Sequence, residues 1–286
     1  MMRFIITFLS ICLLSACTAT TVLPESKPHQ EAPRETMESE ILDKGELLEL
    51  QPIEELLSYE LDEGGGTISI QGKVYCVEVS SIDFWMRDLT DSDIEIIETF
   101  ANLQHLVLFG NLIRDLSPLE NLINLEVLDL GANQINDISS LANLLNLLDL
   151  RLHQNQISDI GTLESLTNLT ILHLGHNQIT DISSLRNLTN LEQLGLGNNQ
   201  VSDISALGYM VNLTSLFLQE NEISDITPLE NLTCLRELHL FGNAITDFTP
   251  LMGLTNLHRL SLDMDLITDE QLEVLKAALP NVLSWG

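Results

Sequence analysis

The chain has 286 residues, 44% of them apolar, which is enough to bury one long domain or two compact ones. The formal net charge is −30, and the chain has only 12 lysines and arginines. This balance argues against nucleic acid as a partner and against adsorption to an anionic membrane surface, because both need clustered basic residues.

Residues 1–16 have the pattern of an export signal. Arg3 precedes an apolar run over residues 4–14, which is too short to span a bilayer but suits a secretory signal. The run ends in Leu14-Ser15-Ala16-Cys17, which resembles the bacterial lipoprotein box. That resemblance implies cleavage before Cys17 and its acylation with palmitate-like chains, which would anchor the protein stably in a membrane. The alternative is an ordinary signal peptide with a chance cysteine.

The next two segments connect the anchor to the repeats. Residues 17–45 carry three prolines among acidic and hydroxyl residues without apolar periodicity, which predicts a disordered tether. The expected location is the bacterial cell envelope, and Thr18 is compatible with sorting to an outer membrane. Residues 46–102 are predicted to form an N-terminal cap, with a helical segment over 46–61, a hairpin of 67–70 and 73–79, and a degenerate first coil. In that coil Thr90 and Asp93 have the spacing of a capping box.

Asparagine then recurs every 22 residues, at 111, 133, 155, 177, 199, 221 and 243, and Asp265 ends the series. A fixed period of this length indicates stacked coils. Seven units over 103–256 read L-x-x-L-x-L-x-x-N-x-I-x-D-I-x-x-L-x-x-L-x-N. The alternating leucines predict one short strand per coil and therefore a parallel sheet. The asparagines are expected to satisfy buried backbone groups of adjacent coils as a structural ladder.

This repeat resembles the leucine-rich-repeat superfamily, specifically the 22-residue class of internalin-like bacterial surface proteins. The resemblance implies an α/β fold: a right-handed solenoid with a parallel β-sheet on its concave face, 3-10 or short helical turns on its convex face, and caps at both ends. It also implies a protein-binding role, of which host adhesion is one version.

The return segment of each coil predicts a helical turn. Ser117-Pro118 and the Thr-Pro pairs at 227–228 and 249–250 suit an N-cap followed by the first helical residue. Seven aspartates, at 115, 137, 159, 181, 203, 225 and 247, precede these turns. They could form a calcium site, but local capping is favoured because each recurs with its turn. Residues 257–286 predict a final strand and a capping helix opened by Thr268 and Gln271 and stopped by Pro280.

Binding chemistry is expected at the third, fifth and seventh positions of each unit, which point outward and form three columns across the concave sheet, since the other positions are scaffold. Exposed aromatic residues are typical interface anchors. Trp85 shares this face, although the N-terminal hairpin could cover it. The predicted partner-binding residues are Phe109, Arg151, His153, His173, His176, Phe217, His239 and Phe241.

Two other uses of this face stay open. Gly175, Gly195 and Gly197 predict a depression beside Phe217 that could hold a small ligand or glycan. His153, His173 and His176 could instead hold a metal, but Arg151 opposes a cation there.

The remaining expectations concern what the chain lacks. Catalytic motifs are not found, so we expect no enzyme activity and no cofactor. The partner is expected to be a protein and the chain a monomer. Cys76 and Cys234 lie about seven coils apart in this register, too far to pair with each other, and are expected to be small buried residues.

Overall fold

A computed structural model describes residues 67–70 and 73–285, which divide into two compact units at Cys76 and Val77. The first unit holds β1 (Thr67–Ile70) and β2 (Lys73–Cys76), paired antiparallel as the predicted hairpin, with the second strand three residues shorter than expected. The export signal, the Cys17 anchor, the tether and the helical segment over 46–61 lie outside the described residues.

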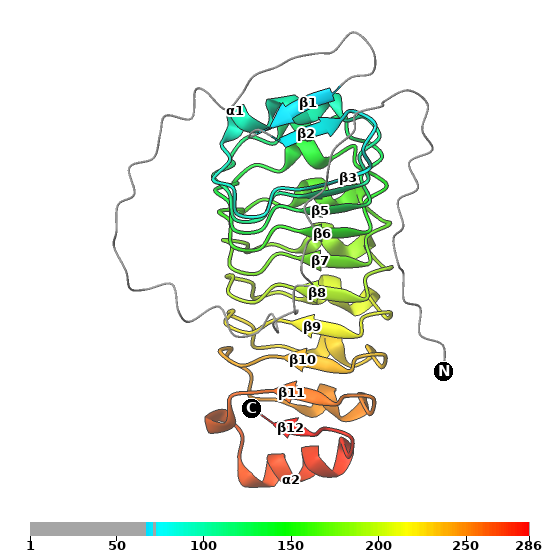
Figure 1. Cartoon of the computed structure of the whole chain (residues 1–286). Coiled ribbons are helices and arrows are strands. Elements are labelled where there is room, and N and C mark those ends of the chain that lie inside the picture. The colour runs from blue at the N-terminus through cyan, green and yellow to red at the C-terminus, as the bar shows by residue number, and fades with distance from the viewer. Residues whose placement is uncertain (1–66, 71–72, 286) are drawn as a thin grey trace, which may run out of the picture. The chain divides into compact units, whose positions relative to one another are not determined.

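The second unit is a solenoid in which one parallel sheet runs from β3 to β12 (Figure 1). Each coil from β3 to β11 contributes three residues, and Leu172 lies opposite Leu150 on one side and Leu194 on the other, at the 22-residue period. The strands are β3 (Ser81–Asp83), β4 (His105–Val107), β5 (Val127–Asp129), β6 (Asp149–Arg151), β7 (Ile171–His173), β8 (Gln193–Gly195), β9 (Ser215–Phe217), β10 (Glu237–His239), β11 (Arg259–Ser261) and β12 (Ser284–Trp285).

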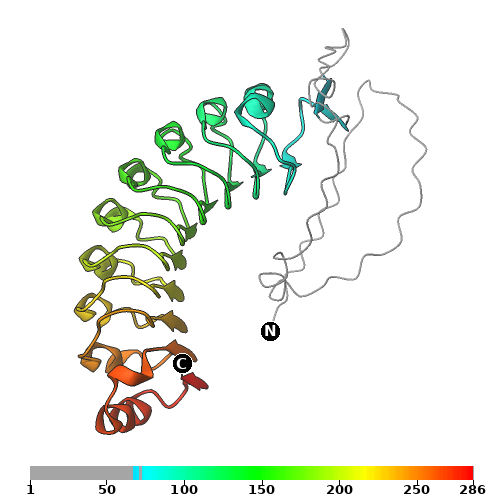
Figure 2. The same cartoon turned by 90° about the vertical axis from the view of Figure 1, so that its left-hand side faces the viewer.

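Within this unit the strands line the inner side of a curve and the helical turns line its outer side (Figure 2). The leucine-rich-repeat solenoid expected from the sequence is therefore confirmed. The 3-10 turns span Glu95–Thr99, Ser117–Leu119, Ser139–Leu141, Gly161–Ser165, Ser183–Asn187, Ser205–Tyr209, Thr227–Leu229, Thr249–Gly253 and Met264–Leu266. The repeating leucines and isoleucines between the two sides are almost fully buried and make one continuous core.

The asparagine ladder joins each coil to the one before it. The Asn177 amide donates to the backbone carbonyls of Leu152 and Leu174, at 3.0 and 2.9 Å, and its oxygen accepts the N–H of Ile157 at 3.0 Å. This confirms its structural role, because three backbone groups depend on one buried side chain. The expected last member is wrong: Asp265 lies inside a 3-10 turn, and Asp263 instead accepts the N–H of Gly242 at 2.7 Å.

The convex turns are capped by their aspartates. In all seven coils the aspartate accepts the N–H two residues later, as Asp203 does from Ser205 at 2.8 Å. The expected Ser/Thr N-cap is wrong by one residue: Ser117 is the first residue of its turn and Pro118 the second, and Asp115 supplies the hydrogen bond. The preceding carboxylate does the capping because it reaches the free N–H directly.

Both predicted capping boxes are present. Thr90 and Asp93 open α1 (Asp91–Ile94), which continues as a 3-10 turn, and Thr268 and Gln271 open α2 (Asp269–Ala278). The chain then returns to the sheet as β12, which the sequence did not predict. Within the described part, neither helix has the length and apolarity needed to cross a bilayer.

Candidate functional site

The concave face carries two ring clusters on different strands. The first, here called the ring row, has four rings spread over the five coils of β3 to β7. Trp85 stacks on Phe109 with centroids 6.1 Å apart, Phe109 contacts His153 at 5.6 Å, and His153 contacts His173 edge-on at 6.4 Å. Trp85 is 51% exposed, and the other three side chains are half-buried. The ring row therefore presents aromatic surface to solvent beside the core.

A glycine makes room for the contact between Phe109 and His153 in the ring row. Phe109 and His153 are two strands apart, with Gly131 between them in the same column. A Cβ on Gly131 would lie 2.8 Å from Phe109 Cδ2 and 2.5 Å from His153 Cε1, so any larger residue would push the rings apart. The sequence places Gly131 in an outward column, which is the signal that could have pointed to this contact.

Charged groups lie beside the ring row. The Arg151 guanidinium binds the Asp149 carboxylate through two hydrogen bonds, at 3.1 and 2.8 Å, which raises the pKa of Arg151. Burial, together with the positive field of Arg151 and the nearby His153, lowers the pKa of His173 below its usual value. His173 is therefore uncharged near neutral pH, and its Nε2 is buried without a hydrogen-bond partner in the described part of the chain.

The second cluster is the ring pair of Phe217 and His239, which stack with centroids 5.1 Å apart on β9 and β10. His239 Nε2 lies 3.2 Å from a Glu237 oxygen, and Arg259 Nη1 lies 3.3 Å from the same oxygen. Gly195 separates the ring pair from the ring row, since it lies between His173 and Phe217 in the sheet. The predicted anchors thus form two subsites rather than one centre.

Two predicted residues stand outside these clusters. Phe241 is half-buried two residues after β10, whereas His176 is exposed on the turn after β7 with φ at +55°. Among the residues described, no three His, Cys, Asp or Glu side chains come close enough to hold a metal ion, so His153, His173 and His176 do not form the alternative metal site.

The predicted depression is filled at its centre. Gly197 is buried because the Gln219 amide lies over it, and a Cβ there would be 2.3 Å from Gln219 Nε2. At Gly195 the His173 ring already lies within 3.5 Å of where a Cβ would be. The prediction of a depression at Gly175, Gly195 and Gly197 is therefore wrong at Gly197, because the Gln219 side chain occupies the space that this glycine leaves.

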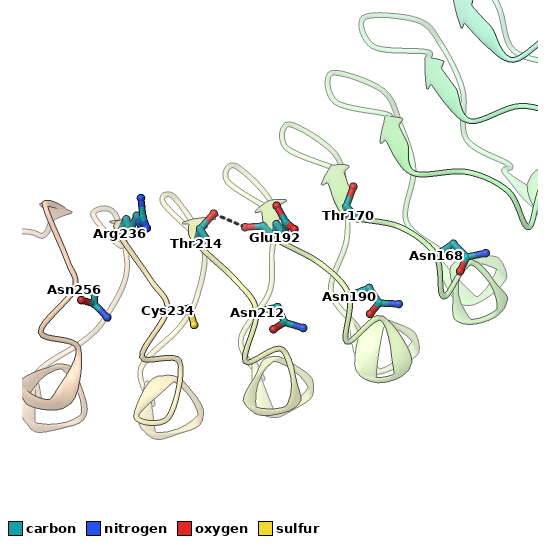
Figure 3. Close-up of a pocket in the computed structure, with 9 residues that line it drawn as sticks. All are labelled: Asn168, Thr170, Asn190, Glu192, Asn212, Thr214, Cys234, Arg236 and Asn256. Carbon is teal, nitrogen blue, oxygen red and sulfur yellow. Dashed lines mark hydrogen bonds between the residues drawn. The ribbon is translucent and has the colours of Figure 1, made fainter. Parts of the chain in front are cut away.

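A groove of about 680 Å³ runs along one flank of the solenoid instead (Figure 3). One wall is formed by Asn168, Asn190, Asn212 and Asn256. They belong to a second asparagine ladder, here called the flank ladder, in which Asn124, Asn146, Asn168, Asn190, Asn212 and Asn256 each donate to a carbonyl of the preceding coil. These amides are already engaged in joining coils, so the groove is a consequence of the scaffold. This asparagine is the last residue of the repeat pattern, and its role in joining coils was not predicted from the sequence.

Cys234 occupies the flank ladder position between Asn212 and Asn256. Both Cys76 and Cys234 are free and exposed, so the expectation of buried cysteines is wrong. Cys234 is exposed because its position in the coil faces the groove and not the core.

Comparisons with known proteins agree with this geometry. The family model for leucine-rich repeats, described as two copies, matches residues 101–143, 145–187, 167–209 and 211–251. No curated protein matches the chain by sequence. Among solved structures, internalin C2 from Listeria monocytogenes is 37% identical, with 68% of this chain and 88% of that chain covered and a TM-score of 0.64.

Two further structures are similar. An internalin from the same organism (inlF) is 26% identical over 75% of this chain and 83% of that one, with a TM-score of 0.51. A leucine-rich-repeat protein from Leptospira interrogans is 30% identical over 67% of this chain and 50% of its own length, with a TM-score of 0.63.

Proposed function

Since the chain belongs to the leucine-rich-repeat family, in its internalin-like class, we propose that it is a non-catalytic module that binds a protein through its concave face. Solenoids of this kind offer an extended concave surface to their partners. One observation carries the proposal: the ring row and the ring pair place six aromatic or imidazole rings on the face that the core does not use. Aromatic side chains so placed are typical of interface anchors.

The face is large enough for a stable interface. Nine strands from β3 to β11 at a spacing of roughly 4.8 Å extend along about 40 Å of sheet. A protein–protein interface of ordinary size needs about 800 Å² on each partner, which a surface of this length and three outward columns can supply. The proposed contact residues are Phe109, Arg151, His153, His173, Phe217, His239 and Phe241, with Trp85 added from the structure and His176 kept at the edge.

The proposed setting is the bacterial envelope. Cleavage before Cys17 and acylation of its sulfur would anchor the chain, and residues 17–45 would hold the solenoid away from the bilayer. The partner would then be a protein of the envelope or of another cell. Labelling cells with an alkynyl palmitate tests the anchor: wild type should incorporate the label, Cys17→Ala should not, and equal labelling would refute it.

Affinity capture from surface-labelled cells tests the binding face. Alanine at Phe109 or Phe217 should raise the dissociation constant about 30-fold, and so reduce partner recovery, if that residue is an anchor worth about 2 kcal/mol. Tyr209→Ala is the matched control, because Tyr209 is a half-exposed aromatic residue on the 3-10 turn side, where it stacks on Arg186. Equal recovery by all three variants would refute binding through the concave face.

A further inference from the structure

The two halves of the concave face differ in charge. Among the outward side chains of the β3 to β7 coils there are three carboxylates and one arginine, which leaves two negative charges in excess: Asp83, Asp129, Asp149 and Arg151. In the columns of β8 to β11, Glu237 and Asp263 stand against Arg259, which leaves one. Glu237 is also engaged by both His239 and Arg259. The acidic excess is therefore greatest on the half that carries the ring row.

The carboxylates of this half are held in place. Asp83 accepts the N–H of Trp85 at 2.9 Å, and Asp129 accepts the N–H of Gly131 at 3.0 Å, each from the residue two positions later. Each aspartate therefore leaves the same face of the sheet as the ring row and next to it. In the described residues neither has an ion-pair partner within 4 Å, whereas Asp149 is neutralised by Arg151.

From this juxtaposition we propose that the half of the concave face formed by β3 to β7 docks a basic segment of a partner protein, in which lysine or arginine alternates with apolar side chains. The inference rests on the proposed function and specifies the partner's chemistry. The apolar side chains would pack on the ring row. The basic side chains would meet Asp83 and Asp129 and could lie over the faces of Trp85 and Phe109 as cation–π contacts.

The rest of the molecule favours the same partner. The net charge of −30 attracts a basic segment from a distance and repels an acidic one, which raises the rate of encounter with the right partner. His173 adds no opposing charge near neutral pH, because its pKa is lowered by burial. Arg151 is hydrogen-bonded to Asp149 and also attracts Asp129, which lies opposite it on the neighbouring strand, so Asp83 is the carboxylate of this half that Arg151 does not offset.

The test uses Trp85 as its reporter. The chain has two tryptophans, so Trp285→Phe in the otherwise full-length protein leaves Trp85 as the single one. The probes are three amidated octapeptides: alternating arginine and leucine, alternating glutamate and leucine, and arginine alone. Binding is measured by Trp85 fluorescence. The paired substitution Asp83→Asn with Asp129→Asn keeps both backbone hydrogen bonds, because the asparagine oxygen still accepts them.

The matched control is Glu120→Gln with Glu222→Gln, two exposed residues away from the concave columns that give the same change in net charge. We expect the arginine–leucine peptide to bind more tightly than either other peptide. We expect the aspartate pair to weaken it about fivefold, as two exposed ion pairs would, and the control to leave it unchanged.

Three results would overturn the proposal: no binding of the arginine–leucine peptide, equal weakening by both double variants, or equal binding of arginine–leucine and arginine peptides. The last two would mean general attraction of cations to an acidic chain. If these results appear while capture from cells still depends on Phe109, the basic partner is refuted and the proposed function stands. If capture does not depend on the concave face, the proposed function itself fails.

Discussion

Cys234 interrupts the flank ladder, and restoring it should stabilise the protein. Six asparagines in this column donate to a carbonyl 23 residues earlier at 2.8–3.0 Å. The same geometry would pair residue 234 with the Val211 carbonyl, but a thiol is too weak a donor to replace an amide. Cys234→Asn should therefore add the missing hydrogen bond.

The size of the gain follows from the exposure of the site. One intramolecular hydrogen bond contributes about 0.5–1.5 kcal/mol, and the exposed flank favours the lower end. For a folded unit of this size that gain should raise the melting temperature by roughly 1–6 °C. Removing a member of the intact ladder, as in Asn212→Ala, should produce a loss of similar size.

Guanidinium chloride unfolding under reducing conditions measures the effect, with Cys234→Ala and Cys234→Asp as controls. Aspartate matches asparagine in size and accepts hydrogen bonds but cannot donate to a carbonyl, so it should give no gain. The reasoning would be refuted if Cys234→Asn were no more stable than Cys234→Ala, or if aspartate stabilised the protein as much as asparagine.

Three further predictions concern residues of the coils. Asn177→Ala should lower the free energy of unfolding by about 3 kcal/mol or more, because three backbone groups lose their hydrogen-bond partner. Chemical unfolding measures this loss. A loss smaller than that caused by an alanine substitution at an exposed residue would contradict the structural role of the ladder. Because the pKa of His173 is lowered in the folded protein, the unfolded state takes up the proton first as the pH falls. The free energy of unfolding is therefore at its full value above the ordinary histidine pKa, and part of it is lost as the pH falls through the pKa of the folded state. NMR titration should place the midpoint of His173 below the ordinary histidine pKa, and a His173→Gln variant should lose less stability than wild type between neutral and acidic pH. His176→Gly should stabilise the coil by about 1 kcal/mol, since a side chain at positive φ is strained there; no change in melting temperature would argue against that strain.

The repeating features could be predicted because one period assigns every position to a side of the coil. The burial of Leu172, the capping by Asp203 and the bonds of Asn177 all follow from local geometry repeated at 22 residues. A motif present seven times specifies the average coil very well. It says less about what differs between coils.

What could not be predicted depends on contacts between coils. Phe109 and His153 are 44 residues apart, and their contact exists only because Gly131 lies between them. The Gly197 position is filled by Gln219 from the next coil, which no pattern within one repeat indicates. β12 was missed because two paired residues are too short for any periodicity.

Because the strands are in strict register, the outward side chains of the concave face form a regular grid. Each outward side chain is held by the buried leucine beside it, so an exchange at one site leaves the spacing and direction of all the others unchanged. The sites next to Gly131 and Gly197 are the exceptions, because there one coil's glycine makes room for another's side chain. Elsewhere a gene could accumulate substitutions on this face one at a time without refolding the protein, and a laboratory library could do the same to obtain binders for new targets.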